Sequence, residues 1–386
     1  MIWLIYLLLC SVISIADLAV HKNKAFLKVA FSFMVLFFLG MRFAAGVDWS
    51  VYLSLYNGNN INVPFEIGYK ILNVIFSYSG LGFWSFVFFI TLFSFLSLSK
   101  YFSIYSKYPL FCLALYYLLS FAFNVEALRQ IIAVALVINA LVFYLQGKLY
   151  YFYGAVLVGI TMHASATLFL FFPLIDNAKF RSNALYLVMI GVALAVINQF
   201  PIDWIINLIA KNIYNPYIDK IKLYSSEAQP VSFFTINFMF KLFVLMCLMA
   251  AKKNIYASIS SRYQLKLVGV TISLFYLMLF IDVYLGKYGT LKIRLNEYLN
   301  PAFVVMIVLI ISNLKYKFLK QAFSVIVLLY ATISFVKFMN DPYFKNQFIY
   351  HNSLLVYLSG DKGVLVSRED EVFEYWQNRE KIIAGD

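Results

Sequence analysis

The chain has 386 residues, of which 63% are hydrophobic and only 13% are charged, and its mean hydropathy is +0.81. This composition excludes a water-soluble globular domain, in which about a quarter of the residues carry charge. The net charge of +13 does not indicate a nucleic-acid partner, because the basic residues lie in gaps between apolar segments and form no soluble recognition module. We therefore expect the lipid bilayer to be the environment of the chain.

Apolar segments close to twenty residues long recur from one end of the sequence to the other. Each can cross about 30 Å of hydrocarbon as an α-helix, and they lack the polar and apolar alternation of a membrane β-barrel. The opening segment MIWLIYLLLCSVISIA has no basic leading region and no small-residue cleavage site, so we expect a retained first helix. The cysteines lie inside apolar segments and indicate neither a disulfide nor a metal site: Cys10, Cys112 and Cys247.

Basic residues cluster in alternate gaps between the apolar segments, and the positive-inside rule places these gaps in the cytoplasm. The stretch from Phe43 to Glu66 contains no Lys or Arg and is predicted to lie on the periplasmic side. The basic residues of the cytoplasmic gaps are Lys22, Lys24, Lys28, Lys100, Lys107, Lys179, Arg181, Lys252, Lys253, Arg262, Lys266, Lys315, Lys317 and Lys320.

Two segments cannot be simple crossings if all the basic gaps face the cytoplasm. The segment Ile67–Tyr78 is short, and we predict that it is re-entrant or interfacial. The segment Leu149–Pro173 must start and finish on the same side, which requires the chain to break and turn back near His163. Broken helices are tolerated in membranes where the backbone is buried in protein or lines a wet cavity. The alternative is one long span followed by an unusually basic outer loop.

The other segments are predicted to cross once, which gives an all-α, polytopic inner-membrane bundle of about 10–12 transmembrane helices. We assign residues 1–339 to one transmembrane domain, with outer loops at about 43–66 and 201–232. Residues 340–386 form a polar C-terminal tail that is expected in the periplasm. The predicted single crossings after the first two helices are Trp84–Ser99, Leu110–Phe123, Ala127–Leu145, Ala184–Phe200, Phe233–Ala251, Tyr263–Leu285, Leu295–Asn313 and Leu319–Phe338.

Three arginines stand at the periplasmic ends of predicted spans: Arg42, Arg129 and Arg294. Arginine near hydrocarbon is costly and usually functional, and the guanidinium group suits bidentate binding of phosphate. Each arginine alone could instead extend to the membrane interface, and Asp48 or Glu126 could serve only as a counter-ion. Three arginines on one side nevertheless favour a site for anionic head groups.

Two further polar residues belong to the same predicted side. Gln130 shares a helical turn with Arg129, so both head groups can reach one cavity. His163 lies inside an apolar segment, where its ring must face water or a partner, although a hydrogen bond between helices would also satisfy it. The sequence has no metal-binding, phosphate-loop or nucleophile-elbow motif, so we expect no metal and no cofactor. Arginines and a base suit transfer from a phosphate-activated donor, whose leaving group mainly needs electrostatic stabilisation.

Several sequence runs, in their order and spacing, resemble the EpsG-like branch of the Wzy-type O-antigen and exopolysaccharide polymerases. The runs are LGMRFAAGVDWSVYLSLY with FEIGYKIL, then ALRQIIAVAL, GITMHASATLF and RLNEYLNPAF, and together they cover about residues 30–310. The resemblance implies a glycosyltransferase of the bacterial inner membrane that acts at the periplasmic face. Its substrates would be undecaprenyl-diphosphate-linked repeat units, which it joins into exopolysaccharide or the O-antigen of lipopolysaccharide.

The resemblance also implies roles for individual residues. It carries the family arginines over to Arg42, Arg129 and Arg294, which we expect to bind diphosphate, and the family histidine over to His163, a candidate catalytic residue. In the late family motif an Arg is followed, after three residues, by Tyr-Phe, whereas here Tyr298 is followed by Leu299. The residues themselves leave the proton acceptor open between His163, Asp48 and Glu66. The expected supporting residues are Glu126, Gln130 and Tyr298.

Two other classes of protein remain as alternatives. A flippase for lipid-linked oligosaccharides would also present cations to a diphosphate, but its charges should line a path that is open to both sides. A glycan ligase, which passes the glycan to a different acceptor, would share nearly every feature of the sequence. A chain-length regulator is a candidate protein partner in the polymerase interpretation.

The predicted orientation can be tested by labelling single cysteines with a membrane-impermeant thiol reagent. Asn57→Cys and Ser226→Cys should react from outside the cell, because both positions lie in predicted outer loops. Asn254→Cys and Lys317→Cys should not react until the membrane is opened. Labelling of position 317 from outside would overturn the orientation and would separate the three arginines.

Overall fold

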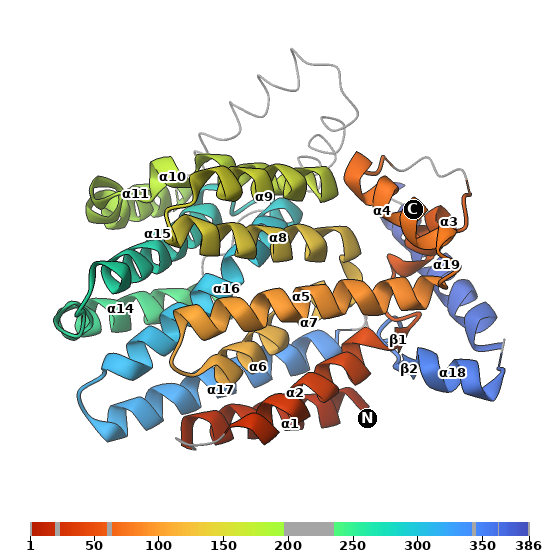
Figure 1. Ribbon diagram of the computed structural model, residues 1–386, viewed down its shortest axis with the longest axis horizontal. Coiled ribbons are helices and arrows are strands. Elements are labelled where there is room, and N and C mark those ends of the chain that lie inside the picture. The colour runs from red at the N-terminus through yellow and green to blue at the C-terminus, as the bar shows by residue number, and fades with distance from the viewer. Residues whose placement is uncertain are drawn as a thin grey trace, which may run out of the picture.

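The computed structural model describes residues 2–19, 24–59, 64–196, 235–341, 345–361 and 363–384. These residues form one bundle of helices, so the all-α prediction is confirmed (Figure 1). The helices that build the bundle are α1 (Ile2–Ala19), α2 (Ala25–Val35), α5 (Phe83–Tyr105), α6 (Pro109–Leu119), α8 (Leu128–Leu145), α9 (Leu149–Met162), α11 (Ala178–Val196), α14 (Ile236–Ala257), α15 (Arg262–Tyr284), α16 (Gly289–Asn313) and α17 (Lys317–Met339).

Six of the described helices are long and apolar enough to cross a membrane, namely α1, α5, α8, α15, α16 and α17. The protein is therefore a multi-pass membrane protein. The predicted outer loop at 201–232 lies outside the described residues. The remaining elements are the π-helix η1 (Leu36–Gly40), β1 (Arg42–Phe43), α3 (Trp49–Tyr56), α4 (Ile67–Tyr78), α7 (Phe121–Glu126), the 3₁₀-helix η2 (Ala164–Phe171), α10 (Phe172–Ile175), β2 (His351–Asn352), α18 (Ser353–Ser359) and α19 (Gly363–Ala384).

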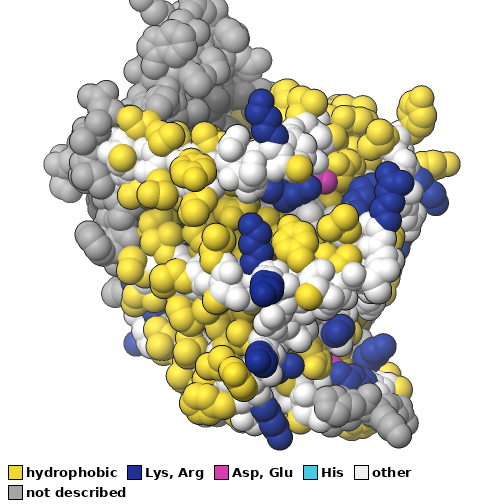
Figure 2. All heavy atoms as spheres, turned by 90° about the vertical axis from the view of Figure 1, so that its left-hand side faces the viewer, with side chains coloured by type: hydrophobic (Ala, Val, Ile, Leu, Met, Phe, Trp, Pro, Cys, Tyr) yellow, Lys and Arg dark blue, Asp and Glu magenta, His cyan; other side chains and the backbone are white. Residues whose placement is uncertain are grey.

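The predicted basic gaps meet at one end of the bundle, which we term the basic end. Lys24 forms an ion pair with Asp17 at 2.5 Å, and the second oxygen of Asp17 accepts a hydrogen bond from the backbone N–H of Phe111 at 2.9 Å. Asn254 donates to the carbonyl oxygen of Asn313 at 3.2 Å. Figure 2 faces this end and shows many Lys and Arg side chains and few carboxylates among the described residues. The gaps that the charge pattern places on one side of the membrane thus lie on one side of the protein.

The chain breaks and reverses at His163, as predicted. Its backbone is extended (φ −156°, ψ 123°) between the end of α9 and the start of η2. Tyr144, at the end of α8, packs against both Phe152 near the start of α9 and Phe172 after η2, with ring centroids 5.4 Å apart in each case. Both ends of this segment therefore lie together at the basic end, which excludes the alternative of a single long span.

Helix α4 lies at the opposite end of the bundle, as Figure 1 shows, and does not cross it. Its first turn packs so closely on α9 that a Cβ atom on Gly68 would lie 2.3 Å from the Thr161 hydroxyl oxygen. Its other end packs on the first turn of α5, where the rings of Phe76 and Phe86 are 4.9 Å apart. The exposed side of α4 presents four apolar residues, as expected for an interfacial helix, namely Ile67, Ile71, Val74 and Ile75, together with Lys70.

The three predicted arginines all lie at the end opposite the basic end, which we term the arginine end. The C-terminal segment folds onto this end rather than extending from it (Figure 1). Strand β2 pairs antiparallel with β1, so that Arg42 lies opposite Asn352. The stretch between β1 and α4, which we predicted as a loop, contains helix α3.

Arg368 of α19 fixes the loop that follows β1. Its side chain is 1% exposed, and it donates hydrogen bonds to the carbonyl oxygens of Ala44 at 3.0 Å, Gln347 at 2.7 Å and Asn346 at 2.8 Å. The Gln347 carbonyl oxygen also accepts a hydrogen bond from Gly46 N–H at 2.8 Å. One arginine therefore supplies donors to three backbone carbonyl groups, and two of these belong to the buried residues Ala44 and Gln347.

Arg368→Ala should lower the free energy of unfolding by about 2–4 kcal/mol, because it leaves the buried Ala44 carbonyl oxygen without this donor and removes one of the two donors to Gln347. Arg368→Lys should recover only part of the loss, since an ammonium group cannot reproduce the planar fork. Thermal unfolding in detergent micelles measures the effect. Glu369→Ala, on the exposed face of the same helix, is the control and should unfold like the wild type. Equal unfolding of Arg368→Ala and the control would contradict the assigned role.

Candidate functional site

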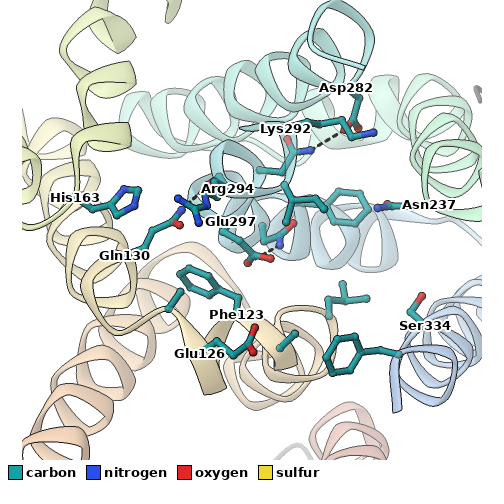
Figure 3. A pocket seen from close by; sticks show the side chains of 18 of the residues that line it. Phe123, Glu126, Gln130, His163, Asn237, Asp282, Lys292, Arg294, Glu297 and Ser334 are labelled. Atoms are coloured by element: carbon teal, nitrogen blue, oxygen red, sulfur yellow. Dashed lines mark hydrogen bonds between the residues drawn. The ribbon is translucent and has the colours of Figure 1, made fainter. Parts of the chain in front are cut away.

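A polar cavity of about 570 Å³ lies inside the bundle and reaches the arginine end. Helices α6, α7, α8, α14, α15, α16 and α17 and the residues around the start of α3 form its wall. Figure 3 shows that polar side chains from several of these helices point into it. Six of the residues singled out from the sequence line the cavity: Asp48, Glu126, Arg129, Gln130, His163 and Arg294.

Arg129 has Glu66 as its counter-ion. Its Nη1 lies 2.5 Å from Glu66 Oε2, and the other carboxylate oxygen of Glu66 accepts a hydrogen bond from the backbone N–H of Ala164 at 3.3 Å. The guanidinium group lies 4.6 Å from the ring centroid of Phe65. Its Nε makes no hydrogen bond to the described residues. Because both oxygens of Glu66 have donors, this carboxylate is fixed in place and orients Arg129.

His163 lies at the same side of the cavity as Gln130 and Arg294, and Figure 3 shows its ring directed toward them. Its Nδ1 is 2.6 Å from Ser165 Oγ, and that hydroxyl donates a hydrogen bond to the Tyr298 hydroxyl oxygen at 3.1 Å. Tyr298 is buried and does not line the cavity, so its contribution is to fix this chain of hydrogen bonds. Gln130 donates to the Arg294 carbonyl oxygen at 2.5 Å and so joins α8 to α16.

Arg42 differs from the other two arginines, because it does not line the cavity. It is 3% exposed and donates to the Val125 carbonyl oxygen at 3.0 Å, to Thr91 Oγ1 at 3.1 Å and to the carbonyl oxygen of Leu39. Among the described residues no carboxylate lies within 4.0 Å of it. The π-helix η1 ends just before Arg42, and the side chain holds this turn to α5 and α7. The structure thus places Arg42 in a scaffold position rather than beside the predicted diphosphate site.

Glu126 connects the cavity to the loop that Arg368 fixes. Its Oε1 accepts a hydrogen bond from Val47 N–H at 3.0 Å. A Cβ atom on Gly46, whose φ is +86°, would lie 2.6 Å from Glu126 Cγ, so glycine is needed there for both conformation and space. Burial and the nearby charge of Asp48 raise the pKa of Glu126 to about 8. The sequence had left open that Glu126 is the counter-ion of Arg129. The structure instead pairs Arg129 with Glu66.

Sequence reasoning missed a second group of charged residues in the cavity. Lys241 forms a buried ion pair with Asp282 at 2.6 Å, and Asn296 Nδ2 donates to the other Asp282 oxygen at 2.7 Å. Glu297 and Lys292 of α16 line the same space. The sequence did contain a signal for this group. Lys241 and Asp282 each lie inside an apolar segment that we predicted as a simple crossing, and charges within membrane spans are usually functional. Within the described ranges, no group of three or more His, Cys, Asp or Glu side chains could hold a metal ion.

The fold and this cavity define a class: a multi-pass α-helical membrane protein with a polar, arginine-containing cavity inside its bundle. The sequence model of the EpsG family matches residues 25–353, and the chain belongs to this family. Membership confirms the predicted family relationship and supports a polymerase-type enzyme of polysaccharide biosynthesis. No curated protein and no solved structure matches the chain. The matched range contains every cavity residue discussed above, whereas α19 lies beyond it.

The raised pKa of Glu126 predicts a pH dependence of stability. The ordinary pKa of its carboxyl is near 4.5, so the folded protein retains a proton that the unfolded chain releases. Stability from this group is therefore greatest below about pH 5 and falls as pH rises toward 8. Glu126→Gln keeps an acceptor for Val47 N–H but cannot ionise. Between pH 6 and pH 9 the wild type should lose about 2–4 °C more in melting temperature than the variant. Parallel curves for the two proteins would contradict the assignment.

Proposed function

We propose that the protein is a membrane glycosyltransferase that polymerises undecaprenyl-diphosphate-linked oligosaccharide repeat units into O-antigen or exopolysaccharide. The reaction would take place at the periplasmic face of the bacterial inner membrane. The observation that carries the proposal is the convergence of Arg129, Arg294 and His163 on one polar cavity. That cavity opens at the end of the bundle opposite the basic end, where the positive-inside rule predicts the periplasm.

In this proposal Arg129 and Arg294 bind the diphosphate of the donor lipid. A guanidinium group forms two parallel hydrogen bonds to phosphate oxygens, and the low dielectric inside a membrane protein strengthens its attraction to developing negative charge. The bond between the anomeric carbon and the diphosphate oxygen breaks, and the bonding electrons leave with the diphosphate lipid. Glu66 holds Arg129 through the 2.5 Å ion pair, so the cation is oriented before substrate binds.

A hydroxyl group of the acceptor sugar forms the new bond to the anomeric carbon and loses its proton. We assign His163 as the proton acceptor, because it lines the cavity beside Arg294 and its ring is held by Ser165. Asp48, which also lines the cavity, is the second candidate for this role. Glu66 is less suitable, since it does not line the cavity and is paired with Arg129. Both substrates are tethered in one membrane leaflet, which favours their encounter in a shared cavity.

The decisive experiment is to incubate the purified protein with one lipid-linked repeat unit and no nucleotide sugar. A ladder of products that differ by one repeat unit supports the polymerase. Movement of the lipid across proteoliposome membranes without elongation would identify a flippase instead. Transfer that occurs only when a different acceptor is added would identify a ligase.

Substitution of the cavity arginines separates phosphate binding from a role in membrane insertion. Arg129→Lys and Arg294→Lys keep the charge but lose the bidentate fork, so polymer formation should fall by about tenfold or more while the yield of folded protein stays normal. Arg262→Lys, at an exposed position of the basic end, is the matched control and should behave like the wild type. Wild-type rates in both cavity variants would remove the diphosphate-binding assignment.

His163→Gln tests the proposed proton acceptor, because glutamine is polar and of similar size but is not a base near neutral pH. The variant should bind lipid-linked substrate about as well as the wild type and form almost no polymer. Near-normal polymer from folded His163→Gln would move the role to Asp48.

A further inference from the structure

The cavity extends away from His163 and Arg294 into a second region formed by α14, α15, α16 and α17. In Figure 3 Asn237 and Ser334 lie on the side of the cavity away from His163, and Glu297 lies between His163 and these two residues. The formal charges of this region cancel, because Lys241 and Lys292 are matched by Asp282 and Glu297. Among its described residues this region contains amides and no arginine, whereas the two guanidinium groups of the cavity lie at the proposed diphosphate site. Such chemistry suits a neutral polar ligand better than a diphosphate.

Asn296 joins this region to the ion pair between Lys241 and Asp282. The residue is 8% exposed and lines the cavity, and its Nδ2 donates to Asp282 at 2.7 Å. Its Oδ1 is buried and accepts no hydrogen bond from the described residues. The contribution of Asn296 is therefore to hold the polar wall of this region in place.

Glu297 is a second acceptor in the same region. Asn300 Nδ2 donates to its Oε2 at 3.0 Å and also to Ser120 Oγ at 2.9 Å, which fixes the carboxylate in place. Among the described residues no Lys or Arg nitrogen lies within 4.0 Å of the Glu297 carboxylate, unlike the paired carboxylates of Glu66 and Asp282. A carboxylate oxygen has several lone pairs, so it can still accept hydrogen bonds from a ligand.

Aromatic rings complete the wall of this region. Tyr330 stacks on Phe240 with centroids 3.7 Å apart, and its hydroxyl donates to Asn237 Oδ1 at 3.0 Å. Phe303 and Phe338 also line the cavity. Aromatic faces offer apolar surface to the C–H groups of a sugar ring, while the amides and carboxylates match its hydroxyl groups, each of which donates once and accepts twice.

We propose that the region around Asn296, Glu297 and Asn300 is the subsite that binds the non-reducing-end sugar of the acceptor. This inference rests on the proposed function, because it names which substrate occupies which part of the cavity. Glu297 follows Arg294 by three residues on α16, so the two side chains are about one helical turn apart on the same side of the helix. The acceptor sugar would therefore be bound beside the donor diphosphate, with its hydroxyl group directed toward the anomeric carbon.

The test uses two ligands that each probe one subsite. The first is the free repeat-unit oligosaccharide, released from the lipid-linked substrate by mild acid, and its binding is measured by saturation-transfer NMR. The second is undecaprenyl diphosphate without sugar, whose binding is measured by its protection of the detergent-solubilised protein against thermal unfolding. Glu297→Gln should weaken oligosaccharide binding about tenfold, because a hydrogen bond to a charged acceptor is the stronger kind, and should leave diphosphate binding unchanged. Arg129→Lys should do the reverse.

Asn296→Ala is the second variant, since Asp282 keeps its ion pair with Lys241 when Asn296 is removed. It should also weaken oligosaccharide binding while its melting temperature shows that it is folded. Lack of oligosaccharide binding by the wild type, or wild-type oligosaccharide binding by both folded variants, would overturn the subsite. Loss of oligosaccharide binding in Arg129→Lys to the same extent as in Glu297→Gln would overturn it too. These binding measurements do not require polymerisation. If the protein binds the oligosaccharide through Glu297 but forms no ladder of products, only the proposed function is rejected.

Discussion

The ion pair between Glu66 and Arg129 joins three parts of the chain that are distant in sequence. Glu66 precedes α4, Arg129 begins α8, and the second oxygen of Glu66 binds the backbone N–H of Ala164 at the reversal after His163. In hydrocarbon a helix that stops and turns back exposes backbone groups that water cannot satisfy. The carboxylate supplies one of the missing acceptors and holds a cation next to the break. Breaking a buried pair of this kind typically costs about 3–5 kcal/mol, so the reversal and the arginine depend on each other.

Charged side chains in the interior of the bundle are also paired, as Glu66 and Arg129 are. Lys241 and Asp282 come from different helices, yet they meet as a buried pair that Asn296 extends. A charged helix inserted alone would carry a large desolvation penalty, and pairing within the assembled bundle reduces it. A cavity can then contain many polar groups without a large net charge, while its two guanidinium groups, those of Arg129 and Arg294, both lie near His163. In our proposal this separation of guanidinium groups from amides lets one cavity distinguish a diphosphate from a sugar.

The sequence predicts the helical bundle, its one-sided basic gaps and the break at His163. These features depend on hydropathy, on segment length and on the number of crossings between basic gaps, all of which can be read from one segment at a time. It also predicts that Arg129 and Gln130 share a cavity and that His163 and Arg294 lie on the same side of the membrane as this pair. It does not predict that Arg42 turns inward, because that depends on where η1 directs the chain and on which carbonyl groups lie nearby. The pairing of Lys241 with Asp282 was missed for a similar reason. The two residues are 41 positions apart on separate spans, and periodicity carries no information about contacts between helices.

The hydrogen bond from Arg368 to Ala44 spans 324 positions of sequence and therefore determines when the arginine end can be completed. Membrane helices insert in order as the ribosome delivers them, at about 5–20 residues per second. At that rate the loop that carries Asp48 is synthesised roughly 15–65 s before the arginine that fixes it. Through this interval the earlier helices can insert and associate, but the loop has no partner from α19. The loop at the arginine end therefore reaches its final hydrogen bonding only after α19 has been synthesised, so an unfinished chain still bound to the ribosome has this loop without its Arg368 donor.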